Sequence, residues 1–204
     1  MLIVGGTNFI GRTFSERAFS FGEFQMSLLN RGKTNPGFLT TVERLLADRN
    51  DEPTCGSVLS GRHFNVIVDF SCMSVIQLEN ILANCSCDHY TFLSSSAVEL
   101  SWPGDDYFRM AQDKLWCEQL VQSACDKALI VRPGFVVGKY DPTDRFEKRG
   151  PTWFWKGTQD EVRPIVEVEL LTSLMYYLVT YRHAGIVRAG YHQPRVSMNS
   201  NFNP

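Results

Sequence analysis

A glycine-rich turn near the N-terminus most constrains what this chain can fold into. Leu2-Ile3-Val4 is an apolar, partly β-branched run typical of a buried strand, and from Ile10 onward apolar residues recur every fourth position, as in an amphipathic helix. Between them Gly5 and Gly11 hold the first and last positions of a G-x-x-G-x-x-G pattern, and Asn8 holds the middle one. A strand that enters a helix through such a turn presents backbone N–H groups and a positive dipole end to a pyrophosphate.

The middle position of this pattern is not glycine. Asn tolerates positive φ better than most other residues, so we expect Asn8 to preserve the turn, with its side chain near the phosphates. The alternative is a structural glycine turn in an unrelated α/β protein. The order of strand, turn and helix favours a phosphate-binding loop.

The rest of the chain alternates short apolar runs with longer amphipathic stretches. Strands are predicted at 25–30, 42–47, 65–69, 90–93, 128–131 and 185–190, and helices at 74–84, 107–123 and 168–182. This alternation predicts an α/β fold, a Rossmann-like doubly wound parallel sheet. We assign residues 1–138 to the dinucleotide-binding domain and 139–204 to a reduced substrate-side lobe of the same compact unit. The stretch 139–155 is predicted to be a loop or lid.

Composition and charge argue against several classes of protein. The 204 residues are 44% hydrophobic and carry a net charge of −2, which is not typical of a nucleic-acid or membrane-surface protein. No apolar run reaches the roughly 18 residues of a membrane span, and Met1 leads directly into a strand, so we expect a cytoplasmic protein. The six cysteines follow no disulfide framework and the four histidines are isolated, so reduced thiols and no metal site are expected.

Across most of its length the sequence resembles the extended short-chain dehydrogenases/reductases, the NAD-dependent epimerase/dehydratase group. It is most similar to an atypical branch with a GGT-x-FIG loop, and its C-terminal part is shorter. The segments that carry the resemblance, besides the glycine turn, are 29–34 (similar to NRGKT of that branch), 47–49 (Ala-Asp-Arg, similar to its GDR), 93–98 (the strand with the catalytic serine), 114–119 (the active-site helix), 132–134 with Gly138, and 140–146 (a substrate-side loop). The resemblance implies a nicotinamide dinucleotide bound along the carboxyl ends of the strands.

The choice of cofactor depends on the end of the second predicted strand. An acidic residue there binds the adenosine ribose hydroxyls, whereas basic residues accommodate a 2′-phosphate. Asn30, Arg31 and Lys33 stand there and favour NADP, with NAD as the alternative if the two basic residues only solvate a loop. The resemblance adds Asp48 as an adenine contact and 70–71 as lining residues. The full predicted cofactor set is Gly5, Thr7, Asn8, Phe9, Ile10, Gly11, Asn30, Arg31, Lys33, Asp48, Phe70, Ser71, Ser94, Lys114 and Pro133.

The resemblance also implies a catalytic set of a serine hydroxyl, a tyrosine acid/base and a lysine four residues after it. Ser95 and Lys114 match two of these positions, but Met110 stands where the tyrosine is expected. Tyr107 lies seven residues before Lys114, about 10.5 Å away along a regular helix axis. We predict that Tyr107 substitutes if the helix begins after it, with an aspartate of 105–106 as N-cap.

Three functions are compatible with these residues. The first is an oxidoreductase or epimerase with an impaired proton relay, acting on a sugar-like or carbonyl small molecule such as a nucleotide sugar. The second is a non-catalytic dinucleotide-binding regulator or scaffold, which Met110 and the short C-terminal part favour. The third, RNA binding, is opposed by the net charge of −2. A homodimer is left open.

Overall fold

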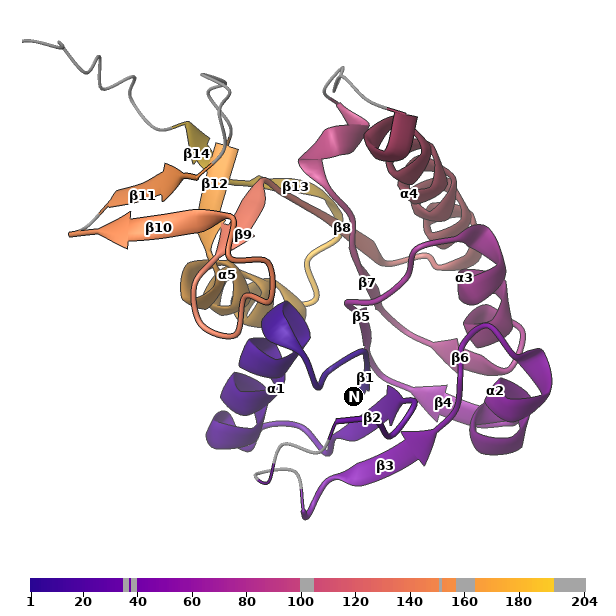
Figure 1. The fold of residues 1–204 in the computed structure, drawn as a ribbon. Helices are drawn as coiled ribbons and strands as arrows, with labels where there is room; N and C mark the ends of the chain where they lie inside the picture. The colour runs from indigo at the N-terminus through magenta and orange to yellow at the C-terminus, as the bar shows by residue number, and fades with distance from the viewer. Residues whose placement is uncertain (35–36, 38–39, 100–104, 151, 157–163, 193–204) are drawn as a thin grey trace, which may run out of the picture.

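The structure is a computed structural model that describes residues 1–34, 37, 40–99, 105–150, 152–156 and 164–192. Seven strands form its main sheet, at the centre of Figure 1. In spatial order they are β13 (Gly185–Ala189), β8 (Ala128–Pro133), β7 (Tyr90–Leu93), β5 (Ile67–Asp69), β1 (Leu2–Val4), β2 (Ser27–Asn30) and β3 (Glu43–Leu46). Every neighbouring pair is parallel, which confirms the predicted α/β fold with a Rossmann-like sheet.

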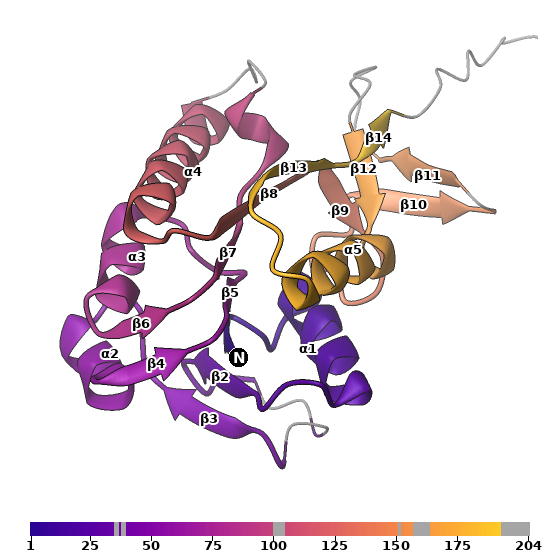
Figure 2. The same ribbon diagram turned by 180° about the vertical axis from the view of Figure 1, so that it is seen from behind.

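Helices cover both faces of this sheet (Figures 1 and 2). One face carries α1 (Phe9–Phe21) and α5 (Val168–Thr180), and the other carries α2 (Glu52–Leu59), α3 (Val75–Leu82) and α4 (Asp105–Ala124). In β1, Ile3 packs in the core beneath α1 and α5, whereas Leu2 and Val4 pack in the core beneath the other three helices. Because helices bury both faces, the strand is apolar throughout rather than alternating.

The helix ends follow from local residue chemistry. Helix α1 stops at Gly22, which takes a left-handed φ of 68° and donates its N–H to the carbonyl of Ala18. Helix α5 buries Leu171, Met175 and Val179 at four-residue spacing, so one stripe faces the sheet. The helices predicted at 74–84, 107–123 and 168–182 are thus present, with ends that differ by two residues or fewer.

The sheet order creates a switch point beside β1. The chain leaves β1 for β2 and β3 on one side, and later returns to β5 on the other side of β1. Val4 is in register with Asp69, so Gly5 and Phe70 begin two neighbouring loops that lead in opposite directions. In open α/β sheets ligands bind at this kind of crevice, outside the carboxyl ends of the strands.

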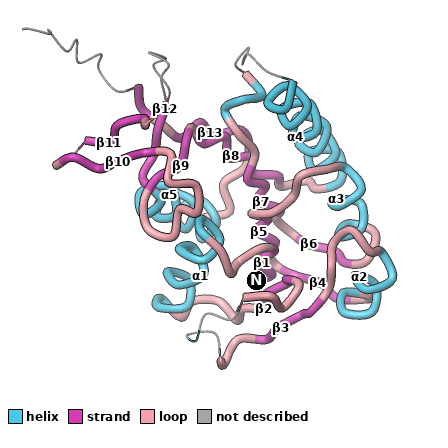
Figure 3. Tube along the Cα trace, viewed as in Figure 1, coloured by secondary structure: helices cyan, strands magenta, loops and turns pink. Residues whose placement is uncertain are grey.

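The stretch 139–155, predicted to be a loop or lid, contains an antiparallel hairpin instead. Its strands are β10 (Phe146–Arg149) and β11 (Thr152–Trp155), drawn in magenta in Figure 3. The loop prediction is therefore wrong for the second half of the stretch. The antiparallel register runs from Phe146 opposite Trp155 to Arg149 opposite Thr152, and it joins two strands that carry no strong pattern of their own.

The C-terminal third contributes to both the main sheet and a smaller one. The smaller sheet contains β9 (Phe135–Val137), β12 (Pro164–Glu167) and β14 (Tyr191–His192). Earlier in the chain, β4 (Arg62–Phe64) and β6 (Cys85–Cys87) form a separate two-stranded sheet, and η2 (Ser96–Val98) is a short 3-10 helix. Since β13 pairs with β8, the segment after residue 138 also completes the main sheet. The domain boundary at residue 138 stays a prediction. None of the described helices is long and apolar enough to cross a membrane.

Candidate functional site

The turn after β1 closes tightly on itself. Gly5 has a left-handed φ of 79°, and a Cβ built on it would lie 2.5 Å from the Cβ of Ser71. A Cβ on Gly11 would lie only 2.2 Å from the carbonyl oxygen of Gly5. Gly11 therefore requires glycine because a larger residue would have to displace backbone, and Gly5 requires it because of its left-handed φ and its contact with the Ser71 side chain.

The expectation of a positive φ at Asn8 is wrong. Asn8 is extended, with φ −137° and ψ 146°, and Phe9 takes the positive φ of 38° instead. The turn therefore accepts a side chain at its middle position without backbone strain at that residue. Asn8 is exposed and makes no side-chain capping hydrogen bond to α1.

The beginning of α1 fits a pyrophosphate. A helix N-terminus without a side-chain cap offers backbone N–H groups and positive dipole charge to an anion, and α1 begins at the switch-point crevice. Thr7 is nearly buried inside the turn, where its hydroxyl accepts a 2.7 Å hydrogen bond from Thr34. This bond joins the phosphate-side turn to the segment that follows β2.

Asn30 ends β2 at the expected adenosine side of the crevice. Its Oδ1 accepts hydrogen bonds from the backbone N–H of Gly32 at 2.8 Å and from Nη2 of Arg44 at 3.2 Å. Its Nδ2 is buried and has no hydrogen-bond partner among the described residues. This end of β2 consequently presents donors and positive charge rather than the carboxylate that would accept two ribose hydroxyls.

Three predicted adenosine-side residues lie within electrostatic reach of one another. Hydrogen bonds from Asn50 hold the pKa of Asp48 below its ordinary value, and the charges of Arg31 and Lys33 lower that pKa further. Both cations are exposed. Arg44, which comes from the neighbouring strand β3, is a member of this group that the sequence did not indicate.

A buried ion pair fixes the end of β5 beside the glycine turn. Arg49 donates to both carboxylate oxygens of Asp69, at 2.7 and 2.8 Å, and Asp69 also accepts from the Tyr90 hydroxyl at 2.9 Å. Burial alone would raise the pKa of Asp69, but the charge and hydrogen bonds of Arg49 hold it below its ordinary value. The Ser71 backbone N–H donates to the same carboxylate at 3.0 Å, so this pair sets the wall against which Gly5 packs.

The other predicted residue of this loop faces the core. Phe70 is half-buried, and its ring centroid lies 5.1 Å from that of Phe14 in α1. Phe70 and Ser71 therefore both lie beside the glycine turn, as the resemblance implies, but only Ser71 contacts the Gly5 position directly.

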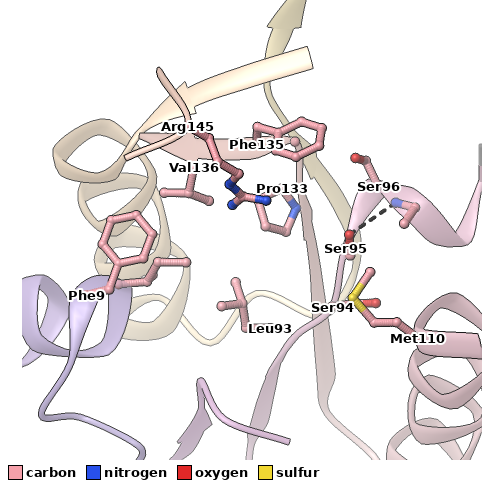
Figure 4. A pocket seen from close by; sticks show the side chains of 13 residues that line it. Phe9, Leu93, Ser94, Ser95, Ser96, Met110, Pro133, Phe135, Val136 and Arg145 are labelled. Atoms are coloured by element: carbon pink, nitrogen blue, oxygen red, sulfur yellow. Dashed lines mark hydrogen bonds between the residues drawn. The ribbon is translucent and has the colours of Figure 1, made fainter. Parts of the chain in front are cut away.

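A pocket of about 220 Å³ opens where β7 and β8 end (Figure 4). Its walls are the segment 93–97, Met110 from α4, the segment 133–136, the pair 9–10 from α1, and Arg145. The structure thus brings the predicted residues Phe9, Ile10, Ser94, Ser95 and Pro133 around one cavity. Met110 and Arg145 lie beside them.

The two predicted serines differ in what their hydroxyls do. Ser94 is buried, and its hydroxyl donates to the Glu118 carboxylate in α4. Ser95 is half-buried; its Oγ accepts a 3.2 Å hydrogen bond from the backbone N–H of Ala97, dashed in Figure 4. The hydroxyl of Ser95 is therefore the one whose proton is still available toward the pocket.

Lys114 lies beneath the pocket rather than in its wall. Its side chain is nearly buried, and Nζ donates a 2.8 Å hydrogen bond to the carbonyl of Leu93. Burial lowers the pKa of Lys114, whereas the charges of Cys72 and Asp69 oppose that shift. Met110, one helical turn earlier, lines the pocket, so a thioether occupies the place where a proton donor is expected.

We expected Tyr107 to act as a substitute acid only if the helix began after it, and this expectation about the helix start is wrong. Helix α4 begins at Asp105, so Tyr107 already belongs to the helix and does not precede it. On a regular helix its Cα lies about 10.5 Å along the axis from that of Lys114. The side chain of Tyr107 lies outside what the structure describes.

A charged network that the sequence did not indicate holds the serine segment in place. Arg132 in β8 donates to Glu118 through Nε at 3.0 Å and Nη2 at 2.5 Å, and also pairs with Glu99 just after η2. Glu99 in turn accepts from Arg188 of β13, at 2.8 Å from Nε. Hydrogen bonds in this network connect Ser94 to α4, β8 and β13, so the pocket wall that carries Ser95 is braced on several sides.

The six cysteines are free thiols, and two pairs lie close together: Cys72 with Cys117 at 3.8 Å and Cys87 with Cys125 at 3.9 Å between sulfurs. Within the described part of the chain, no three His, Cys, Asp or Glu side chains gather as metal ligands.

No protein-family model and no curated protein significantly matches this sequence. Solved structures do match. A UDP-Glc/GlcNAc 4-epimerase from Campylobacter jejuni superposes with a TM-score of 0.71 at 14% identity, covering 94% of this chain and 78% of its own. A UDP-glucose 4-epimerase from Thermus thermophilus, solved in complex with NAD, gives 0.69 at 15% identity over 93% and 76%.

A dTDP-glucose 4,6-dehydratase from Streptomyces venezuelae, solved with NAD bound, gives a TM-score of 0.70 at 16% identity over 94% of this chain and 76% of its own. At such identities the likeness shows the fold alone. The chain therefore shares the Rossmann-like α/β fold of these two epimerases and this dehydratase, which is the fold that the sequence resemblance implies.

Proposed function

We propose that this chain binds a nicotinamide dinucleotide at the switch-point crevice, as a member of the extended short-chain dehydrogenase/reductase family. The observation that carries the proposal is the uncapped N-terminus of α1, directly after a turn in which Gly5 and Gly11 admit no side chain. Backbone N–H groups at this point bind the pyrophosphate. The fold shared with proteins solved in complex with NAD supports the same cofactor class.

We assign the adenosine end to the group around Asn30, with Asp48 at the adenine. Because Asn30 is held by Arg44 and lies beside the exposed Arg31 and Lys33, the site favours a 2′-phosphate and hence NADP over NAD. Ser71, Phe70, Ser94 and Pro133 complete the proposed cofactor contacts.

The proposed activity is weak oxidoreductase or epimerase chemistry on a sugar-like or carbonyl compound such as a nucleotide sugar. The bound cofactor would supply hydride transfer. Ser95 orients the substrate oxygen by donating its free hydroxyl proton, and Lys114 adds positive charge beneath the pocket. Met110 moves no proton. We assign any turnover to Tyr107, which on the regular helix α4 shares a face with Lys114 but lies about 10.5 Å from it along the axis, and this distance is the reason that the proposed activity is weak.

A non-catalytic dinucleotide-binding regulator or scaffold is the second candidate function. Two observations favour it. Met110 lines the pocket where an acid is needed, and the Lys114 ammonium donates a hydrogen bond to the carbonyl of Leu93 instead of lining the pocket. The cytoplasmic location and the homodimer stay predictions from the sequence.

Calorimetric titration with NADP tests the binding proposal. Gly11→Val should abolish binding, because its Cβ would overlap the Gly5 carbonyl. Gly61→Val is the control: a Cβ there meets open space away from the turn, and the left-handed φ of 71° makes valine strained, so this variant carries a folding cost without obstructing the site. Circular dichroism should show both variants folded. Equal NADP affinity in wild type and a folded Gly11→Val would remove the site.

A further inference from the structure

Arg145 gives the pocket a positive charge that nothing in the described structure neutralises. Among the residues that line the pocket it is the one charged side chain (Figure 4). Its Nε is buried without a hydrogen-bond partner among the described residues, and its guanidinium carbon lies 5.2 Å from the ring centroid of Phe135. Five other arginines are paired with carboxylates in the described structure. These are Arg12, Arg49, Arg62, Arg132 and Arg188.

The local fold holds Arg145 in this position. The residue immediately precedes β10, and its carbonyl accepts a 3.0 Å hydrogen bond from the N–H of Lys156 just beyond β11. The adjacent carboxylate, Asp144, points to solvent and pairs with Lys156 at 2.6 Å. Arg145 therefore lies at the pocket, whereas the neighbouring Asp144 carboxylate pairs with Lys156 at the surface.

The surroundings of Arg145 select the chemistry of a partner. An unpaired guanidinium beside apolar groups such as Pro133 and Val136 is unfavourable, and its planar fork of donors matches a carboxylate or phosphate. Ser95 and Ser96 add hydroxyl groups to the same pocket (Figure 4). The volume of about 220 Å³ is below the roughly 300 to 1,000 Å³ of drug-sized ligand pockets, so a small ligand fits best.

We infer that the pocket binds a small compound with an anionic group, a carboxylate or a phosphate ester, whose charge lies against Arg145. Binding of the anionic group depends only on the pocket and on Arg145, and not on the proposed function. The further step, in which a carbonyl of the same compound lies at Ser95 and is reduced or epimerised, rests on the proposed function above.

Matched probes test the inference directly. Dissociation constants for benzoate, its neutral isostere benzamide, and phenyl phosphate are measured by titration, with and without saturating NADP. Benzoate or phenyl phosphate should bind wild type roughly 10- to 100-fold more tightly than benzamide, because a charge-assisted hydrogen bond separates them. Comparing the two anions shows whether the site is built for a carboxylate or a phosphate.

Variants test whether Arg145 is the source of the preference for anionic probes. Arg145→Gln should remove the preference for the anions and leave benzamide affinity unchanged, Arg145→Lys should retain part of it, and Arg62→Gln, at an exposed ion pair on β4, should change nothing. The Met110 methyl resonance, assigned with Met110→Leu, should shift when benzoate binds wild type. This signal places the probe in the pocket even if Arg145→Gln does not fold.

Three results would overturn the inference: equal affinity for benzoate and benzamide, an unshifted Met110 methyl under saturating benzoate, or a folded Arg145→Gln that keeps the preference. A loss of NADP rather than benzoate affinity in Arg145→Gln would also overturn it, since the guanidinium would then serve the cofactor. Benzoate binding at Arg145 without any dinucleotide binding would refute the proposed function and leave the anion site standing. NADP binding without benzoate binding would do the reverse.

Discussion

Replacing Asp69 by asparagine should cost a large part of the stability of this protein. The carboxylate is fully buried and accepts four hydrogen bonds, two from Arg49 and one each from Ser71 and Tyr90. Asp69→Asn keeps the size of the side chain but leaves the buried Arg49 charge without a counter-ion. Removing one partner of a buried pair typically costs about 3–5 kcal/mol, out of the roughly 5–15 kcal/mol by which domains are stable.

Urea denaturation followed by circular dichroism measures this cost. Arg62→Gln, which breaks the exposed Arg62–Glu43 pair, is the control and should cost about 0–1 kcal/mol. The double variant Asp69→Asn/Arg49→Met should be more stable than the sum of the single losses predicts, because it leaves no unpaired buried charge. A loss below about 1 kcal/mol in Asp69→Asn, comparable with the control, would show that Asp69 does not neutralise a buried Arg49 charge.

The same pair predicts the direction of the pH dependence. The folded pKa of Asp69 lies below its ordinary value, so the contribution of the pair is fully present above the unfolded pKa, about 4. It is lost as the pH falls from there toward the folded pKa, where the folded carboxylate takes up its proton. The acid limb of stability against pH should be shallower in Asp69→Asn than in wild type, and parallel limbs would contradict this assignment.

Two further predictions concern the cofactor and the proton relay. Arg31→Ala should weaken NADP binding about tenfold at low salt and leave NAD binding within about twofold, with a smaller effect at high salt; unchanged NADP affinity would remove the 2′-phosphate assignment. With NADPH and a panel of carbonyl and nucleotide-sugar substrates, Met110→Tyr should raise turnover at least tenfold, because a positioned acid or base contributes a factor of about 10² to 10⁴. Tyr107→Phe should abolish the residual activity, and a fully active Tyr107→Phe would exclude that side chain from the relay.

The main sheet could be predicted from the sequence because its signals are local. A strand buried on both faces is apolar throughout, as in the run 65–69, and the glycine turn marks the first crossover to a helix. The hairpin of β10 and β11 could not be predicted in this way, since its two short strands carry no strong pattern of their own and are defined by pairing with each other. Helix α2 was missed as well, because Pro53 and Gly56 weaken its local pattern.

The candidate site could be predicted only where a residue's own neighbours define its role. The glycine turn was found in this way, although the backbone at Asn8 is extended and the strain falls on Phe9. The serine segment was found only through the resemblance to a known family. Arg44 was not found, and the resemblance placed Arg145 only within a substrate-side loop, because each acts through contacts with segments distant in the sequence. The inward turn of Lys114 to the carbonyl of Leu93 likewise depends on tertiary packing.

A crystal structure of this chain soaked with NADP would test the central claim most directly. We expect a dinucleotide across the carboxyl ends of the strands, with its pyrophosphate against Gly5 to Gly11 and its 2′-phosphate beside Arg31 and Arg44. A dinucleotide bound away from the glycine turn, or none bound at millimolar NADP in a crystal whose crevice is open to solvent, would contradict it.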